Sequence, residues 1–163
     1  MKNITTTDLH KIKESLLESM KINFKNNGKL FPVVFIIAPD GEMTVIGTPY
    51  TSQEEKNLMM GMVRSKCKEV DAIAVCIVNE AWIRKVTPEE YKKFQEEFAK
   101  TGKRISGYDD KKEVALMMIE TKLTGETIAF DIDRSNNELI NKISARTEGG
   151  DFSHILSPII NKN

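Results

Sequence analysis

Three short apolar runs constrain the fold most, because residues of both parities are apolar in each of them. The runs are Phe31–Ala38, Ala72–Val78 and Glu113–Thr121. Their length and their content of β-branched and aromatic residues are typical of strands. A strand that is apolar on both faces has to be covered on both faces. The sequence therefore predicts a sheet that lies between two other layers.

A fourth run, Thr127–Arg134, has a different pattern. Its isoleucine and phenylalanine residues fall on one face, while Asp131 and Asp133 fall on the other. Such alternation is typical of a strand with one buried and one solvated face. We therefore expect this strand near an edge of the sheet.

Turn residues join some of these runs into hairpins. Pro39-Asp40-Gly41 separates Phe31–Ala38 from the alternating segment Glu42–Ile46, which predicts a hairpin. Residues 138–146 allow two interpretations. Their isoleucines suit a short helix, whereas Asn136-Asn137 after a strand suits a turn into a sixth strand. We favour the strand.

Three helices are predicted by their capping residues. Each begins at a Thr or Ser followed three residues later by Asp or Glu, and glycine ends the first and the third. The expected helices run from about Thr6 to Asn26, from Ser52, and from Thr87-Pro88 to Gly102. The inner face of the second is expected to comprise Leu58, Met59, Met62 and Val63.

These elements predict an α+β fold, a mainly antiparallel sheet of five or six strands with three helices. A chain of 163 residues fits a single domain over residues 1–163. Three helices are few for covering both faces of such a sheet, and a second copy of the chain could bury the apolar surface that they leave exposed. We therefore expect a homo-oligomer.

Charge and cysteine content narrow the class of partner. The 24 basic and 24 acidic side chains cancel, which argues against a nucleic-acid partner. The lysines of Lys100–Lys112 surround Tyr108, but acidic residues interrupt that cluster.

Cys67 and Cys76 form no CxxC pair, the N-terminus has no apolar signal region, and no apolar run is long enough for a membrane span. We expect a cytoplasmic protein with no membrane partner.

No sequence pattern specifies an activity. The chain lacks the glycine-rich nucleotide motifs, the nucleophile elbow of hydrolases, the zinc-protease motif and the EF-hand. His10 and His154 are the only histidines, and their spacing is not that of metal ligands. We therefore expect no cofactor, no metal and no catalytic residue from motifs, and leave open whether the protein is an enzyme.

Four residues are candidates for a binding site: Glu80, Trp82, Asp131 and Arg134. Glu80 and the lone tryptophan share one strand parity where an apolar strand is expected to end, and sites collect at such ends. The alternative, which we favour, is structural: Trp82 closes one end of the core and Glu80 pairs with Arg84 or Arg134. Asp131 with Asp133 could chelate magnesium, but a solvated edge-strand face is the favoured interpretation.

The segment Val78-Asn79-Glu80-Ala81-Trp82 resembles a family of small uncharacterised proteins of bacteria, phages and plasmids. In that family a loop leads to a charged residue, a glutamate and an apolar strand, as at Lys112, Glu113 and Val114–Ile119, and a later strand ends in arginine, as at Arg134. Lys112 stands where the family has arginine. The resemblance covers about residues 70–155, implies no activity, and supports a strand after the turn at Asn136-Asn137.

By elimination, the sequence favours a non-enzymatic protein-interaction or regulatory module with a protein partner. The alternative is a small enzyme or small-molecule binder with a cleft around Glu80 and Trp82, to which Asp131 or Arg134 contributes. A carboxylate with a raised pKa beside an open pocket would favour this alternative.

Overall fold

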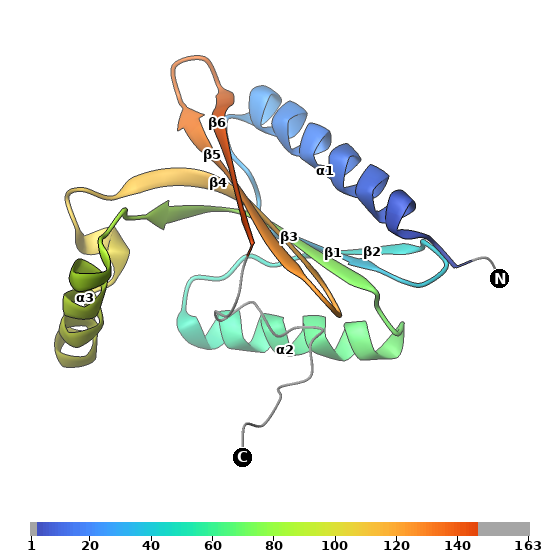
Figure 1. Ribbon diagram of the computed structural model, residues 1–163, viewed down its shortest axis with the longest axis horizontal. Coiled ribbons are helices and arrows are strands. Elements are labelled where there is room, and N and C mark those ends of the chain that lie inside the picture. The colour runs from blue at the N-terminus through green and yellow to red at the C-terminus, as the bar shows by residue number, and fades with distance from the viewer. Residues whose placement is uncertain (1–2, 147–163) are drawn as a thin grey trace.

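The computed structural model describes residues 3–146 and confirms the α+β fold class (Figure 1). The helices are α1 (Thr6–Asn27), α2 (Gln53–Glu69), α3 (Pro88–Thr101) and the short 3-10 helix η1 (Ile105–Gly107). The strands are β1 (Val33–Ile37), β2 (Met43–Gly47), β3 (Ala74–Ile83), β4 (Lys112–Thr121), β5 (Gly125–Asp133) and β6 (Glu138–Arg146). None of the helices in this part of the chain is long and apolar enough to cross a membrane.

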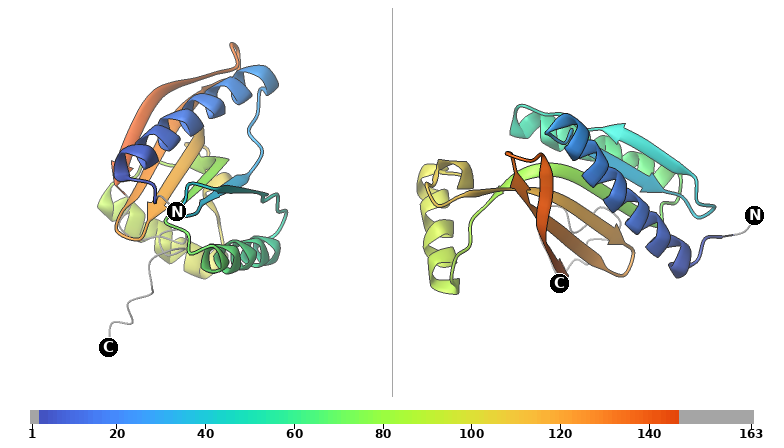
Figure 2. Two further views of the ribbon diagram at one scale, coloured as in Figure 1. Left: turned by 90° about the vertical axis from the view of Figure 1, so that its right-hand side faces the viewer. Right: turned by 90° about the horizontal axis from the view of Figure 1, so that it is seen from above.

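The six strands form one antiparallel sheet in the order β2-β1-β3-β4-β5-β6. The second helix, α2, connects the edge strand β2 to β3, and β1 lies between these two strands in the sheet. The helix therefore passes over β1 and covers one face. The first helix lies across the other face (Figures 1 and 2). The predicted cover on both faces is therefore confirmed for β1 and β3, while β4 contributes only the partly buried Met118 to the core on the α2 face. The predicted strand at residues 138–146 is confirmed as well.

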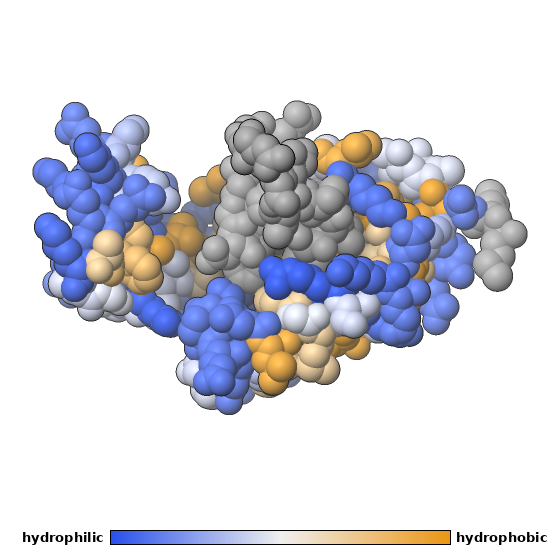
Figure 3. All heavy atoms as spheres, turned by 90° about the horizontal axis from the view of Figure 1, so that it is seen from below, coloured by the Kyte–Doolittle hydropathy of each residue, from blue (hydrophilic) through white to orange (hydrophobic). Residues whose placement is uncertain are grey.

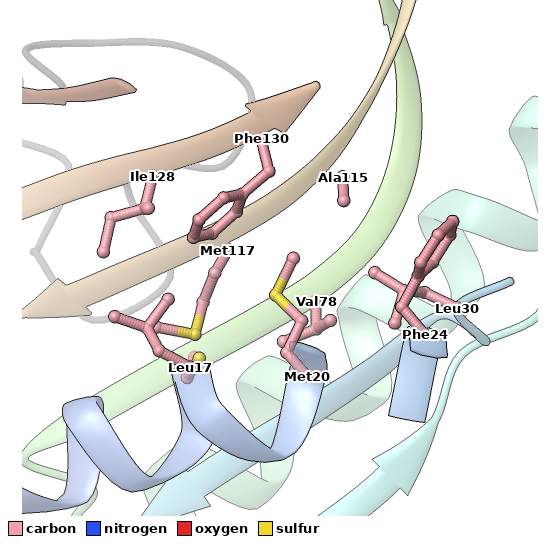
Figure 4. Close-up of a cluster of buried hydrophobic side chains, with 10 residues drawn as sticks. Leu17, Met20, Phe24, Leu30, Val78, Ala115, Met117, Ile128 and Phe130 are labelled. Atoms are coloured by element: carbon pink, nitrogen blue, oxygen red, sulfur yellow. The ribbon is translucent and has the colours of Figure 1, made fainter. Parts of the chain in front are cut away.

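The core on the α1 face packs the second half of α1 against the middle of the sheet (Figure 4). Three helix residues at helical spacing, Leu17, Met20 and Phe24, are buried there. The sheet residues beneath them are Cys76, Val78, Ala115, Met117, Ile128 and Phe130. Because Ile128 and Phe130 are buried while Asp131 and Asp133 face the other side, the predicted one-sided character of β5 is confirmed.

The core on the α2 face corrects one prediction. The side chains that α2 buries are Met60, Val63 and Cys67, against Val34, Ile36, Val75 and Ile77. Leu58 and Met62, expected inside, are 66% and 53% exposed. The spacing of Met60, Val63 and Cys67 aligns one stripe with the sheet and turns Leu58 and Met62 away from it. Apolar atoms accordingly appear among hydrophilic ones in the view from the α2 side (Figure 3).

The long strands β3 and β4 carry α3 away from the rest of the molecule. Ala74 pairs with Thr121 at one end of this hairpin, and Ile83 pairs with Lys112 at the other. The strand β3 therefore continues past Val78, where it was expected to end. The helix α3 has the predicted caps at Thr87 and Gly102, yet none of its side chains is buried. It stands apart from the body of the fold in Figures 1 and 3. Residues 84–111, which include α3 and join β3 to β4, therefore form an arm.

Candidate functional site

Three charged residues from neighbouring strands meet on the α1 face. Glu80 of β3, Glu113 of β4 and Arg134, directly after β5, point to the same side of the sheet. Nη2 of Arg134 lies 3.2 Å from Oε2 of Glu80 and 2.9 Å from Oε1 of Glu113. We call this group the arginine clamp. It confirms the structural interpretation in which Arg134 is the partner of Glu80.

The arginine clamp holds the loop that connects α1 to β1. The backbone N–H of Leu30 donates to Oε1 of Glu80 at 2.8 Å, and Nη1 of Arg134 donates to the carbonyl of Gly28. Gly28 ends α1 with a left-handed φ of 68°, which favours glycine. The clamp therefore fixes where the chain goes after the helix.

Both carboxylates of the clamp are paired with the same guanidinium, that of Arg134. Hydrogen bonds to Glu113 and to Glu80 raise the pKa of Arg134, so the guanidinium stays charged. The side chains of Glu80 and Glu113 are only 19% and 30% exposed. Because each carboxylate faces a permanent cation, the arrangement suits an ion pair better than proton transfer.

Trp82 lies beside the clamp but outside the core. It pairs across the strands with Glu113, and Nζ of Lys111 lies 5.3 Å from the centre of its ring. It is 44% exposed and belongs to neither buried cluster. The expectation that it closes one end of the core is wrong, because β3 runs beyond the helices that cover the sheet.

Asp131 does not join the other candidates. Its side chain is on the opposite face, where Nζ of Lys112 lies 2.6 Å away and Nδ2 of Asn141 donates at 2.9 Å. The hydrogen bonds from Lys112 and Asn141 hold its pKa below the usual range. Asp133 instead bonds within its own turn, to Ser135 and Asn136. Within residues 3–146, no three His, Cys, Asp or Glu side chains are placed to hold a metal ion.

An apolar hollow near the clamp lies between α1 and β1. Its volume is about 280 Å³. The lining consists of seven apolar and two neutral polar residues, with no ionisable group. These are Leu16, Ser19, Met20 and Asn23 of α1, Leu30 and Phe31 of the connecting loop, Val33 and Phe35 of β1, and Val78 of β3. We call it the α1–β1 groove.

The loop held by the clamp forms one end of the groove. Leu30, whose N–H is bound by Glu80, is buried against the core, and Phe31, which follows it, is 62% exposed. Nζ of Lys29 lies 4.8 Å from the centre of the Phe31 ring. The apolar run predicted that the strand begins at Phe31, but β1 starts at Val33. Pro32 was the available indication, because proline lacks the N–H that a strand ladder uses.

Comparisons with protein-family models, curated proteins and solved structures found no match for this chain. Its function is therefore inferred from the groove and the clamp that shapes it.

Proposed function

We propose that this chain is a non-enzymatic protein-interaction module, and that its α1–β1 groove binds an apolar segment of another protein. The observation that carries the proposal is the uncharged, apolar lining of the groove, with Phe31 exposed at its end. Protein-binding surfaces typically combine a desolvated apolar pocket with an accessible aromatic residue.

The lining of the groove favours an anchoring side chain over a small molecule. Its volume of about 280 Å³ is at the lower end of the usual range for small-ligand sites, about 300–1,000 Å³. No charged residue lines it, and its polar lining residues are Ser19 and Asn23. One or two large apolar side chains of an amphipathic segment would match both features.

The clamp supports the same proposal by fixing the groove before binding. Glu80 and Arg134 each bind the backbone of the connecting loop, so Leu30 and Phe31 need little further ordering when a partner docks. Ordering a loop costs binding free energy, and a loop that is already held avoids much of that cost. The role of the ion pair in this proposal is to hold the loop in place, not to take part in a reaction.

The alternative proposal is a small enzyme or small-molecule binder around Glu80 and Trp82. Both oxygens of Glu80 already accept hydrogen bonds, from Leu30 and Arg134. A proton-transfer role would require Arg134 to move away first. This makes the alternative the weaker of the two proposals.

A random-peptide display library, selected on the purified protein, tests the main proposal. We expect enriched peptides to carry large apolar residues at helical spacing. Phe31→Ala should weaken a selected peptide about tenfold, since truncated interface aromatics often cost more than 1 kcal/mol. Ser19→Arg places a charge in the groove at an exposed α1 position and should abolish binding.

Leu58→Ala is the matched control, because Leu58 is as exposed as Phe31 but lies on the outer side of α2. Its variant should bind like the wild type. Failure to enrich any peptide, or selected peptides that bind both groove variants at full affinity, would count against the groove as the binding surface.

A further inference from the structure

Within residues 3–146, the edge strand β2 pairs with β1 alone, so one side of its backbone faces away from the sheet. The amide of Ala38 donates to the carbonyl of Glu42, and the amide of Thr48 donates to the carbonyl of Pro32. Because hydrogen bonding alternates along an antiparallel strand, the even-numbered residues of β2 face β1. The N–H and C=O groups of Met43, Val45 and Gly47 therefore point outward from the sheet.

The two edges of the sheet differ in how they discourage further pairing. The edge strand β6 carries charged Glu138 and Lys142, its register with β5 shifts at a bulge, and Asn141 has a left-handed φ of 52°. Charges and bulges of this kind protect edges against other strands. The β2 edge has neither, because MTVIG contains no charge and no proline and its register with β1 is continuous.

We propose that β2 pairs with β2 of a second copy of this chain, antiparallel and centred on Val45, to give one continuous sheet across a two-fold axis. The outward groups of Val45 then meet those of Val45 in the second copy, and Met43 meets Gly47. Each such facing pair can exchange two backbone hydrogen bonds. The pairing leaves none of the three outward residues of β2 unmatched.

The side chains fit the same register. Val45 is 56% exposed on the α1 face, and the pairing sets it against its own copy, while Thr44 comes opposite Ile46. Pairs of β-branched residues directly across an antiparallel ladder are stabilising, and no like charges meet within β2. A two-fold interface needs a self-complementary surface of this kind. The occupant of this edge is therefore a second copy.

The dimer would also extend the surface beside the groove, although the proposal does not depend on the groove. Val45 lies opposite Phe35, which lines the groove, and both are on the α1 face. In the dimer, the apolar strip of Phe35 and Val45 continues into the same strip of the second copy. Failure of peptide binding would leave the dimer intact, so the two proposals can fail separately.

Opposite charges introduced at Val45, the residue on the proposed two-fold axis, test the dimer. The wild type should show concentration-dependent dimerisation in sedimentation velocity. Val45→Lys and Val45→Glu alone should each weaken dimerisation about tenfold or more, because like charges then face each other. An equimolar mixture of the two variants should form a heterodimer. Val45→Thr, which retains a β-branched side chain and the N–H, should still dimerise.

Ile143→Lys is the control for a new lysine on an exposed apolar strand position, since Ile143 is 50% exposed at the opposite edge. It should dimerise like the wild type, and circular dichroism should show all variants folded. A wild type that stays monomeric, or a dimer that survives both charged variants of Val45, would overturn the proposal. So would a dimer disrupted by Ile143→Lys alone.

Discussion

Arg134 and Glu80 are 54 residues apart in the sequence, yet Nη2 of the arginine lies 3.2 Å from Oε2 of the glutamate. The same guanidinium donates to the carbonyl of Gly28, and the same carboxylate accepts from the amide of Leu30. One ion pair thus joins β3 and the end of β5 to the loop after α1. It is a structural bond between three parts of the chain that do not follow one another.

Arg134→Met should destabilise the fold. The methionine can still pack over the ring of Phe24, 5.5 Å from the guanidinium carbon in the wild type, but Glu80 and Glu113 lose their shared cation. Hydrogen bonds to charged groups contribute about 1.5–3 kcal/mol, and partial exposure reduces this, so we expect a loss of about 1–2 kcal/mol. Urea unfolding followed by circular dichroism measures it.

Lys25→Met is the matched control for Arg134→Met. Nζ of Lys25 lies 2.7 Å from Oε1 of Glu138, but both side chains are about half exposed. Exposed ion pairs contribute little, so we expect a change below about 0.5 kcal/mol. Equal losses in the two variants would show that the clamp is no more than an ordinary surface pair.

Trp82→Ala should cost little stability. A fully buried aromatic residue would cost about 3–5 kcal/mol, but Trp82 is 44% exposed and lies at the outer end of β3. We expect a loss of about 1 kcal/mol, from partial burial and from the contact with Lys111. As the only tryptophan, it should emit at long wavelength in the native protein. A blue-shifted emission with a large loss would place Trp82 in the core.

Neither cysteine should react with a thiol reagent in the folded protein. Burial raises the pKa of Cys76 to about 12, and burial together with the charge of Glu120 raises that of Cys67 to about 11. Only the thiolate is nucleophilic, and both side chains are buried. Labelling at pH 8 should modify neither thiol in buffer and both in denaturant. Fast labelling of either thiol in buffer would show that its packing is loose.

Glu126 should make the fold sensitive to acid. Burial acts to raise its pKa, but hydrogen bonds from Ser144 and Lys13 outweigh it, and the net pKa is lowered. A carboxylate whose pKa is lowered by folding stabilises the fold when the pH is above the ordinary pKa of 4.5. This stabilisation is lost as the pH falls through the lower pKa of the folded state.

Glu126→Gln should accordingly flatten the loss of unfolding free energy between about pH 5 and pH 2. Lys13→Met should flatten it as well, because Nζ of Lys13 lies 3.2 Å from the carboxylate. Urea unfolding at a series of pH values provides the comparison. Parallel curves for the wild type and both variants would mean that Glu126 titrates alike in the folded and unfolded states.

Local sequence patterns were sufficient to predict where the three helices begin and which segments form strands. Thr5 with Asp8 and Thr87 with Glu90 form complete capping boxes, so α1 and α3 begin where expected. Gly102 ends α3 in the left-handed region for the same local reason. Strand parity correctly predicted that β1 and β3 are covered on both faces. Each of these features depends on residues within a few positions of one another.

Features that depend on distant residues could not be predicted in the same way. Met59 and Met60 are adjacent, so two apolar stripes of α2 fitted the sequence, and only packing on the sheet favours Met60. The sequence offered both Arg84 and Arg134 as partners of Glu80, and the order of the strands determines that Arg134 is the one beside it. The groove was missed because its end, Leu30 and Phe31, is shaped by that distant ion pair.

The arm should be removable without unfolding the rest of the protein. None of the side chains of α3 is buried, and Ile83 and Lys112 are the last paired residues of β3 and β4. Asn-Gly in place of residues 84–111 would close β3 and β4 with a two-residue turn, the favoured connection for such a hairpin. The aromatic contacts among Phe94, Phe98 and Tyr108 would be lost with the arm, but they lie outside both cores. We expect cooperative unfolding with a free energy within about 1 kcal/mol of the wild type, as is usual for changes away from a core. A shortened chain that does not unfold cooperatively would show that α3 supports the sheet.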